Sequence, residues 1–185
     1  MNRFFLLLLG CMVFTLPNFF SEDEVENVAS VTQAAVVDLN PTAGNFVTGQ
    51  IVFTQQADGV LVTANMEHLT PGEHGFHIHE VGDCDAPDGS SAGAHYNPHQ
   101  HSHGSRESDQ RHMGDLGNII ADADGKAHLE YLDSTLQLNG ADSIIGKSVI
   151  VHAQVDDFTT QPTGNSGARV ACGVIQAVES QSQAQ

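Results

Sequence analysis

The sequence predicts an all-β domain, and three observations point to this class. About eight short segments rich in β-branched and apolar residues follow one another between residues 31 and 177. Tight-turn sequences separate several of them, such as ADG at 57–59 and DADG at 122–125. No long segment shows the roughly 3.6-residue periodicity of an amphipathic helix. Strands of this number and length close into a Greek-key barrel or a sandwich.

The first three segments are predicted to form antiparallel hairpins. Residues 31–40 are mostly β-branched and apolar, and residues 45–56 alternate polar and apolar side chains with a break at Gly49. The turn at 57–59 leads into residues 60–69, which are again rich in apolar side chains. This succession is the sequence signature of neighbouring strands joined by tight turns.

Two long polar segments interrupt the later strands. A turn at 70–75 leads into the strand that carries His77 and His79. Further strands are predicted over 118–121, 127–131, 148–153 and 170–177. Residues 82–117 and 156–168 fit no strand pattern, and the first of these segments carries five histidines. Long loops of this kind are functional or disordered, and we expect a metal and a disulfide to order the first one.

Composition limits the classes of partner. The chain has 185 residues, of which 40% are hydrophobic, which is enough for one domain with one core. Its formal net charge is -17, from 23 acidic and 6 basic residues. This charge argues against nucleic acid or an anionic membrane surface as a partner. An anionic substrate would therefore need a local positive site.

The N-terminus predicts export to the periplasm or the extracellular space. Arg3 precedes an apolar run at residues 4–16, which is too short to span a membrane and suits a signal peptide. A lipoprotein signal ending at Cys11 and a buried N-terminal helix are the alternatives. We expect four parts: a signal peptide at 1–21 with cleavage between 20 and 30, a flexible acidic segment at 22–30, the folded domain at 31–178 and a disordered tail at 179–185.

Of the three cysteines, Cys11 falls in the predicted signal. Cys84 and Cys172 remain in an exported chain, where they can form a disulfide. A bridge that closes a loop of this length contributes about 4 kcal/mol in the chain-entropy model. Two unpaired buried thiols are the alternative.

The histidines show metal-ligand spacing. His77 and His79 alternate along a predicted strand, so both side chains point to one face and form half of a metal site. The others fall into short groups: His95, then His99, His101 and His103, then His112 with Asp115, and finally His152. An H-x-H pair together with an H-x-x-D turn favours a metal centre over unrelated structural histidines.

Five segments resemble the metal-binding and signature segments of copper/zinc superoxide dismutases. They are GFHIHEVGDCD at 75–85, AHYNP at 94–98, RHMGDLGN at 111–118, VIVH at 149–152 and GNSGARVACGVI at 164–175. They occur in the order of that family, and the resemblance covers residues 31–175. It implies an eight-stranded Greek-key β-barrel with two long functional loops, a metal-binding loop and an electrostatic loop.

The resemblance also implies an antioxidant enzyme with one copper and one zinc ion per chain. Its pattern assigns copper to His77, His79, His95 and His152. It assigns zinc to His95, His103, His112 and Asp115. Such oxidoreductases convert superoxide to dioxygen and hydrogen peroxide by alternate reduction and oxidation of copper. In this pattern His95 bridges both ions and donates a proton, and zinc orders the site.

Two further residues take roles from the same pattern. Arg169 matches an arginine beside the copper channel, where a guanidinium can hold a small anion. Asp156 matches a carboxylate that bridges one copper histidine and one zinc histidine. A solvated loop acid, like its neighbour Asp157, is the alternative reading of Asp156.

Some features depart from the common eukaryotic pattern. Cys84 comes early, as in the bacterial exported branch, whereas residues 95–112 keep the eukaryotic spacing. Dimers of the two branches use different surfaces and some members are monomers, so a homodimer is one of two open outcomes. His99 and His101 are additional. They are surface residues or capture copper or zinc, and His101 is also an alternative to His103 on zinc.

Two other functions remain open from the sequence. A carrier or chaperone-like barrel would bind metal without turnover, and a structural or adhesion barrel would not need these histidines. The complete set of copper histidines together with Arg169 favours the enzyme.

Overall fold

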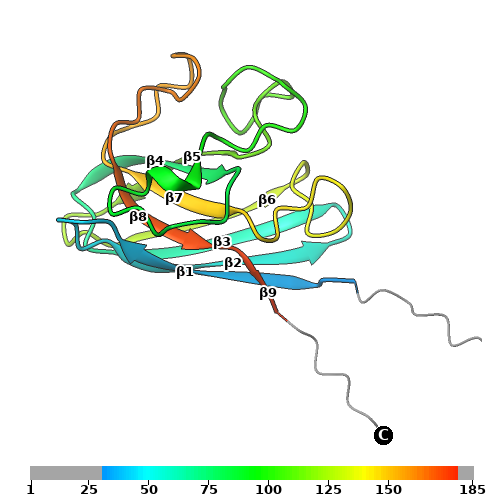
Figure 1. The fold of residues 1–185 in the computed structure, drawn as a ribbon, viewed down its shortest axis with the longest axis horizontal. Helices are drawn as coiled ribbons and strands as arrows, with labels where there is room; N and C mark the ends of the chain where they lie inside the picture. Colours follow the sequence, from blue (N-terminus) through cyan, green and yellow to red (C-terminus); the bar gives the residue numbers. More distant parts are fainter. Residues whose placement is uncertain (1–30, 179–185) are drawn as a thin grey trace, which may run out of the picture. The chain divides into compact units, whose positions relative to one another are not determined.

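The structure is a computed structural model that describes residues 31–178 as nine β-strands and one short 3-10 helix (Figure 1). In chain order the elements are β1 Ala34–Pro41, β2 Thr48–Gln56, β3 Gly59–Glu67, β4 Gly72–His79, η1 Ser90–Ala92, β5 Asp115–Ala121, β6 Ala127–Asp133, β7 Ser148–His152, β8 Arg169–Val174 and β9 Gln176–Ala177. Among these residues no helix has the length and apolarity to cross a membrane. The predicted signal peptide, acidic segment and tail, together with Cys11, lie outside the described residues.

Hydrogen bonds close the strands into one antiparallel barrel. The strands follow the order β2-β3-β6-β5-β4-β7-β8-β1-β9, and β1 also pairs with β2, which closes the sheet. Neighbours such as β3 and β6 are not consecutive in the chain, as in a Greek key. The short strand β9 follows β8 after one residue and pairs with β1. The predicted eight-stranded Greek-key β-barrel is confirmed, with β9 as a two-residue addition.

A row of paired residues shows how the sequence fills the barrel. Val37 of β1 pairs with Ile51 of β2, which pairs with Ala64 of β3, and all three are fully buried. The adjacent residues Asp38 and Gln50 are exposed. Side chains alternate between the two faces of a strand, so the hydrophobic pattern sets this register. Burial of each large aliphatic side chain contributes about 1.5–3 kcal/mol.

Two strands begin earlier than the sequence predicts. The predicted turn at 70–75 is mostly part of β4, which pairs with β5 from its first residue. Gly75 lies within this strand, paired with Asn118, and glycine is needed there because a Cβ would come within 2.7 Å of the Ser166 side chain on the β7–β8 loop. β5 begins at Asp115 because this residue pairs with His77. Gly75 therefore permits the β7–β8 loop to approach the strand and is not part of a turn.

Two long connections bring the candidate site together. The β4–β5 connection contains η1, and both this loop and the β7–β8 loop project from the same end of the barrel, green and orange in Figure 1. A disulfide joins Cys84 of the first loop to Cys172 of β8, with the Cα atoms 5.8 Å apart. It packs with Ala92 of η1 and Ile150 of β7. The predicted disulfide is thus present, and it fastens η1 to the barrel.

Candidate metal centre

Four histidines from three parts of the chain converge in one buried cluster. His77 and His79 alternate along β4, His152 ends the neighbouring strand β7, and His95 comes from the β4–β5 loop. A backbone bridge between His79 and His95 holds this loop against β4. Each residue is at most 4% exposed, and each offers one nitrogen to a group whose ligand atoms all lie within 4.8 Å of one another. The structure therefore brings together the four residues predicted for copper.

Each of these imidazoles has one partnered nitrogen and one without a partner. His79 Nδ1 donates to the Gly93 carbonyl at 2.9 Å, and His152 Nδ1 donates to the Gly167 carbonyl at 3.2 Å. The nitrogens without a partner are His77 Nδ1, His79 Nε2, His95 Nε2 and His152 Nε2. A buried polar atom without a partner costs free energy. A cation bound by these four nitrogens would remove that cost.

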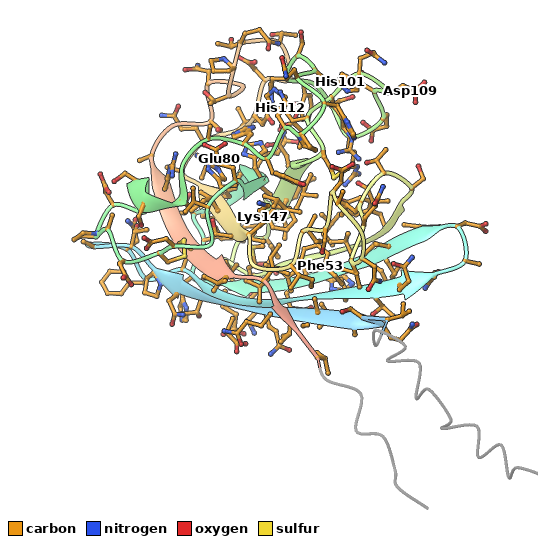
Figure 2. All side chains as sticks on the ribbon, turned by 45° about the vertical axis from the view of Figure 1, so that its right-hand side comes forward. Phe53, Glu80, His101, Asp109, His112 and Lys147 are labelled. Atoms are coloured by element: carbon orange, nitrogen blue, oxygen red, sulfur yellow. A yellow bond between two sulfur atoms is a disulfide. The ribbon has the colours of Figure 1, made fainter. Side chains whose placement is uncertain are left out.

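A second buried cluster shares His95 with the first. The Nδ1 atoms of His95, His103 and His112 lie 2.9, 3.0 and 3.2 Å from the same oxygen, Asp115 Oδ1. Asp115 Oδ2 accepts hydrogen bonds from the backbone N–H groups of Gly104 at 3.1 Å and His112 at 3.0 Å. Figure 2 shows His112 on the loop beyond the end of the barrel. The arrangement surrounds one fixed carboxylate with three imidazoles.

The two alternatives raised for these loops have distinct positions. His101 lies outside the second cluster, and its Nδ1 donates to the Arg111 carbonyl at 3.2 Å. Asp157 is exposed and caps its own turn, accepting from the backbone N–H of Thr160 at 2.7 Å. His103 and Asp156 belong to these buried groups of possible ligands, and His101 and Asp157 do not.

Asp156 connects the two clusters. Its Oδ2 lies 2.7 Å from His77 Nε2, and its Oδ1 lies 2.8 Å from His103 Nε2. The Asn118 side chain holds the Asp156 backbone through two hydrogen bonds of 2.8 and 2.9 Å. Gly164 packs so closely that a Cβ at this position would overlap the Asp156 carboxylate. The carboxylate is thus held from three sides in an orientation that fixes both imidazole rings.

The protonation states differ between the clusters. Burial lowers the pKa of all four histidines of the first cluster, to about 4 for His95 and about 3 for His152, so they are neutral at pH 7. Burial also opposes charge on His103, but hydrogen bonds to Asp115 and Asp156 raise its pKa to about 9. Burial favours the neutral form of both carboxyls, yet hydrogen bonds, first from His103, hold their pKa well below the usual range. A cation in the second cluster would replace the His103 proton.

Comparisons with known proteins identify the family. A family model described as copper/zinc superoxide dismutase matches residues 47–175. A Cu-Zn superoxide dismutase from Onchocerca volvulus is 48% identical over 144 residues, which cover 71% of this chain and 90% of that relative. The chain belongs to the copper/zinc superoxide dismutase family.

Two further similarities agree with membership of the copper/zinc superoxide dismutase family. An extracellular Cu-Zn superoxide dismutase from Brugia pahangi is 41% identical over 161 residues, covering 82% of this chain and 79% of that protein. The crystal structure of the clock protein EA4 matches with a TM-score of 0.74 and 38% identity, covering 80% of this chain and 97% of that one. The similarity therefore extends over the described domain in sequence and in fold.

The copper and zinc ions that the superoxide dismutase family implies fit the two clusters. The first cluster offers four nitrogens that have no protein partner, each from a neutral histidine whose other ring nitrogen is hydrogen-bonded to the protein. Imidazole nitrogens suit copper and zinc alike. The second cluster offers three nitrogens around one carboxylate oxygen, a donor set that suits four-coordinate zinc.

Arg169, the cation expected beside the copper channel of the superoxide dismutase, lies next to the first cluster. Its Nη1 donates to the Gly89 carbonyl at 2.7 Å, and its Nη2 donates to the Gly93 carbonyl at 2.6 Å. The same Gly93 carbonyl accepts from His79 Nδ1. The guanidinium is half-buried and keeps further N–H groups for an anion. Its position depends on η1, which the disulfide fastens.

Three contributors to the superoxide dismutase site were not identified from the sequence. Asn118 and Gly164 support Asp156, although both lie inside segments that carry the family resemblance. Arg111 forms a buried ion pair with Asp133 at 2.6 Å and donates to the His112 carbonyl at 3.0 Å. A basic residue directly before a histidine predicted to bind zinc was the available signal for Arg111.

Proposed function

We propose that this chain is an exported superoxide dismutase whose two clusters hold the two ions of the family. Copper is held by His77, His79, His95 and His152. Zinc is held by His95, His103, His112 and Asp115. One observation carries this assignment: four buried nitrogens without partners face one another, beside a carboxylate surrounded by three imidazoles, and His95 belongs to both groups.

The residues of the chain orient the reactants and supply protons. Copper bound in the first cluster supplies the one-electron chemistry by which two superoxide ions and two protons become one dioxygen and one hydrogen peroxide. His95 Nδ1 faces Asp115, and its Nε2 has no protein partner, so Nε2 is the atom that holds and releases a proton. Asp156 keeps the rings of His77 and His103 in place during this exchange.

Arg169 captures the anion in this proposal. The net charge of -17 repels superoxide from the molecule as a whole, so a local cation is needed at the site. Two carbonyl groups of the η1 region fix the guanidinium, and its charge persists at any physiological pH. A fixed donor beside the cluster can therefore hold superoxide without reorganising.

One variant in each cluster tests the assignment. His152→Ala is expected to lose copper and keep zinc, whereas His112→Ala is expected to lose zinc and keep copper, as counted by mass spectrometry of the metals. His128→Ala is the control, because His128 is exposed on β6 and outside both clusters. Loss of zinc with retained copper in His152→Ala would contradict the assignment.

Export and the limits of the domain form part of the same proposal. The extracellular relative supports export. We assign residues 1–21 to a signal peptide cleaved between 20 and 30, residues 22–30 to an acidic segment, and residues 31–178 to the superoxide dismutase domain, followed by a tail at 179–185. The intact mass of the secreted chain tests this, since a lipid on Cys11 or an uncleaved N-terminus would contradict it. Light scattering decides between a homodimer and a monomer.

A further inference from the structure

Two histidines outside both clusters have the spacing of metal ligands. His99 and His101 lie on the loop that carries the zinc histidines, with ring centroids 5.7 Å apart. In the buried copper cluster, His79 lies at a centroid distance of 5.0 Å from His95 and 5.7 Å from His152. The two surface imidazoles are therefore as close as rings that converge on one ion.

Hydrogen bonds prepare His101 to act as a ligand. Its Nδ1 donates to the Arg111 carbonyl at 3.2 Å, which places the proton on Nδ1 and leaves the lone pair on Nε2. The Asn97 side chain holds the His101 backbone, accepting from its N–H at 3.0 Å and donating to its carbonyl at 2.8 Å. Two histidines of the buried cluster, His79 and His152, are fixed in the same tautomer by a hydrogen bond from Nδ1 to a backbone carbonyl.

Carboxylates lie next to these histidines. His99 Nε2 is 3.5 Å from Asp142 Oδ2, close to the separation of about 3.3 Å expected for two ligand atoms on a tetrahedral ion with bonds of about 2.0–2.1 Å. Asp109 and both histidines line one hollow of about 250 Å³, and Figure 2 shows His101 and Asp109 on this loop. Arg111 also lines the hollow, but its charge is compensated by the buried ion pair with Asp133.

We propose that His99, His101 and Asp142 form a third, solvent-facing site for a divalent transition-metal ion, Zn²⁺ or Cu²⁺, with water completing the coordination. Imidazole and carboxylate ligands together suit both ions. In the described structure the three residues do not yet bring their ligand atoms within 4.8 Å of one another, so the His99 ring, whose side chain is 50% exposed, turns to close on the ion. The net charge of -17 raises the local concentration of cations at the surface. The site shares no residue with the two inner centres and stands independently of their assignment.

Calorimetric titration with ZnCl₂ tests the site. The protein is first loaded with copper and zinc, its metal content is counted, and free metal is removed. Wild-type protein is expected to bind one further Zn²⁺ per chain, and the double variant His99→Gln/His101→Gln is expected to bind none. His128→Gln, which changes an exposed histidine on β6, is expected to keep the third ion. Counting the ions before titration separates this result from any failure of the inner assignment.

Two results would overturn the proposal: no further ion bound by the wild-type protein, or a third ion retained by the double variant. Asp142→Asn leaves both imidazoles in place and is expected to lower the affinity for the third ion by at least about tenfold. Loss of an outer hydrogen-bond partner alone lowers metal affinity by about 10–100-fold, and loss of a proposed ligand should cost no less. NMR of ring-labelled histidines gives a second readout, because Zn²⁺ must shift the signals of His99 and His101 and leave that of His128 unchanged.

Discussion

Replacing Gly164 by alanine tests how the β7–β8 loop fixes both ions. A Cβ at Gly164 would overlap the Asp156 carboxylate and come within 2.5 Å of His103 Nε2. Asn118 holds the Asp156 backbone through two hydrogen bonds, so the carboxylate can move aside only by rotating its side chain, which breaks its contacts with His77 and His103. Gly164→Ala therefore displaces the group that orients His103 while leaving every metal-ligand residue in the sequence.

The substitution is expected to lower both the stability of the domain and its affinity for zinc. Gly164 has φ 64°, a left-handed conformation that costs a residue with a Cβ about 1–2 kcal/mol. Overpacking against Asp156 adds about 1–3 kcal/mol of lost stability. Loss of the hydrogen bond that orients a ligand lowers metal affinity by about 10–100-fold. Zinc affinity should fall by this factor, and copper affinity should fall less, because the Cβ approaches His103 and not His77.

Competition with a chromophoric chelator measures the zinc affinity, and thermal unfolding in the presence of EDTA measures the stability. Gly44→Ala is the matched control, because Gly44 has φ 81° and a Cβ there would meet no atom within 4 Å. It carries the backbone strain without the overlap. Equal zinc affinities for Gly164→Ala and Gly44→Ala would refute the reasoning.

Three further predictions concern the arginine, the disulfide and pH. Arg169→Ala should lower the rate of superoxide dismutation at least several-fold and reduce its dependence on salt, because the fixed cation beside the cluster is lost. Cys84→Ser should lower the free energy of unfolding by about 2–5 kcal/mol and also lower the rate, since η1 is released. Four of the cluster histidines have a lowered pKa and His103 has a raised one, so the folded and unfolded chains bind equal numbers of protons at about pH 7, where the metal-free protein should have its highest melting temperature. Below this pH the unfolded chain takes up protons that His95 and His152, with pKa values of about 4 and 3, do not bind in the folded state. Above it the unfolded chain loses a proton that His103, with a pKa of about 9, still holds, so stability falls as pH rises toward 9.

Each of these predictions has a control or an outcome against it. Lys126→Ala removes an exposed charge between β5 and β6 and should leave the rate unchanged, and an Arg169→Ala enzyme with the wild-type rate and salt dependence would contradict the role of Arg169. Treatment of the wild-type protein with a reductant should reproduce the loss in Cys84→Ser. A melting temperature that is constant between pH 4 and pH 9 would contradict the assigned histidine states.

Local patterns were sufficient to predict most of the barrel. Alternation in residues 45–56 grouped Ile51 and Phe53 on one face of the strand, and both are fully buried. The strand starts at Gly72 and Asp115 could not be predicted in this way, because pairing between β4 and β5 decides them. Glycine, a common turn residue, lies in β4 at position 75, where the β7–β8 loop comes close to the strand.

In the candidate site, too, local patterns predicted some features and long-range contacts decided others. Spacing and family resemblance were sufficient to predict all the residues of both clusters. Most of these residues lie close together in the sequence, and His152 is the last residue of a strand. The support of Asp156 by Asn118 joins residues 38 positions apart, and no local pattern predicts such a contact. The spacing favoured His103 as the zinc ligand and kept His101 as an alternative, and the fold separates the two by directing His101 Nδ1 to a backbone carbonyl.

The central claim is tested most directly by measuring superoxide dismutation and metal content on one sample of purified, metal-loaded protein. The account predicts rapid turnover with one copper and one zinc ion per chain in the inner centres. Both ions bound without turnover would contradict it, and would identify the chain as a metal carrier that keeps the barrel and its ligands without the activity.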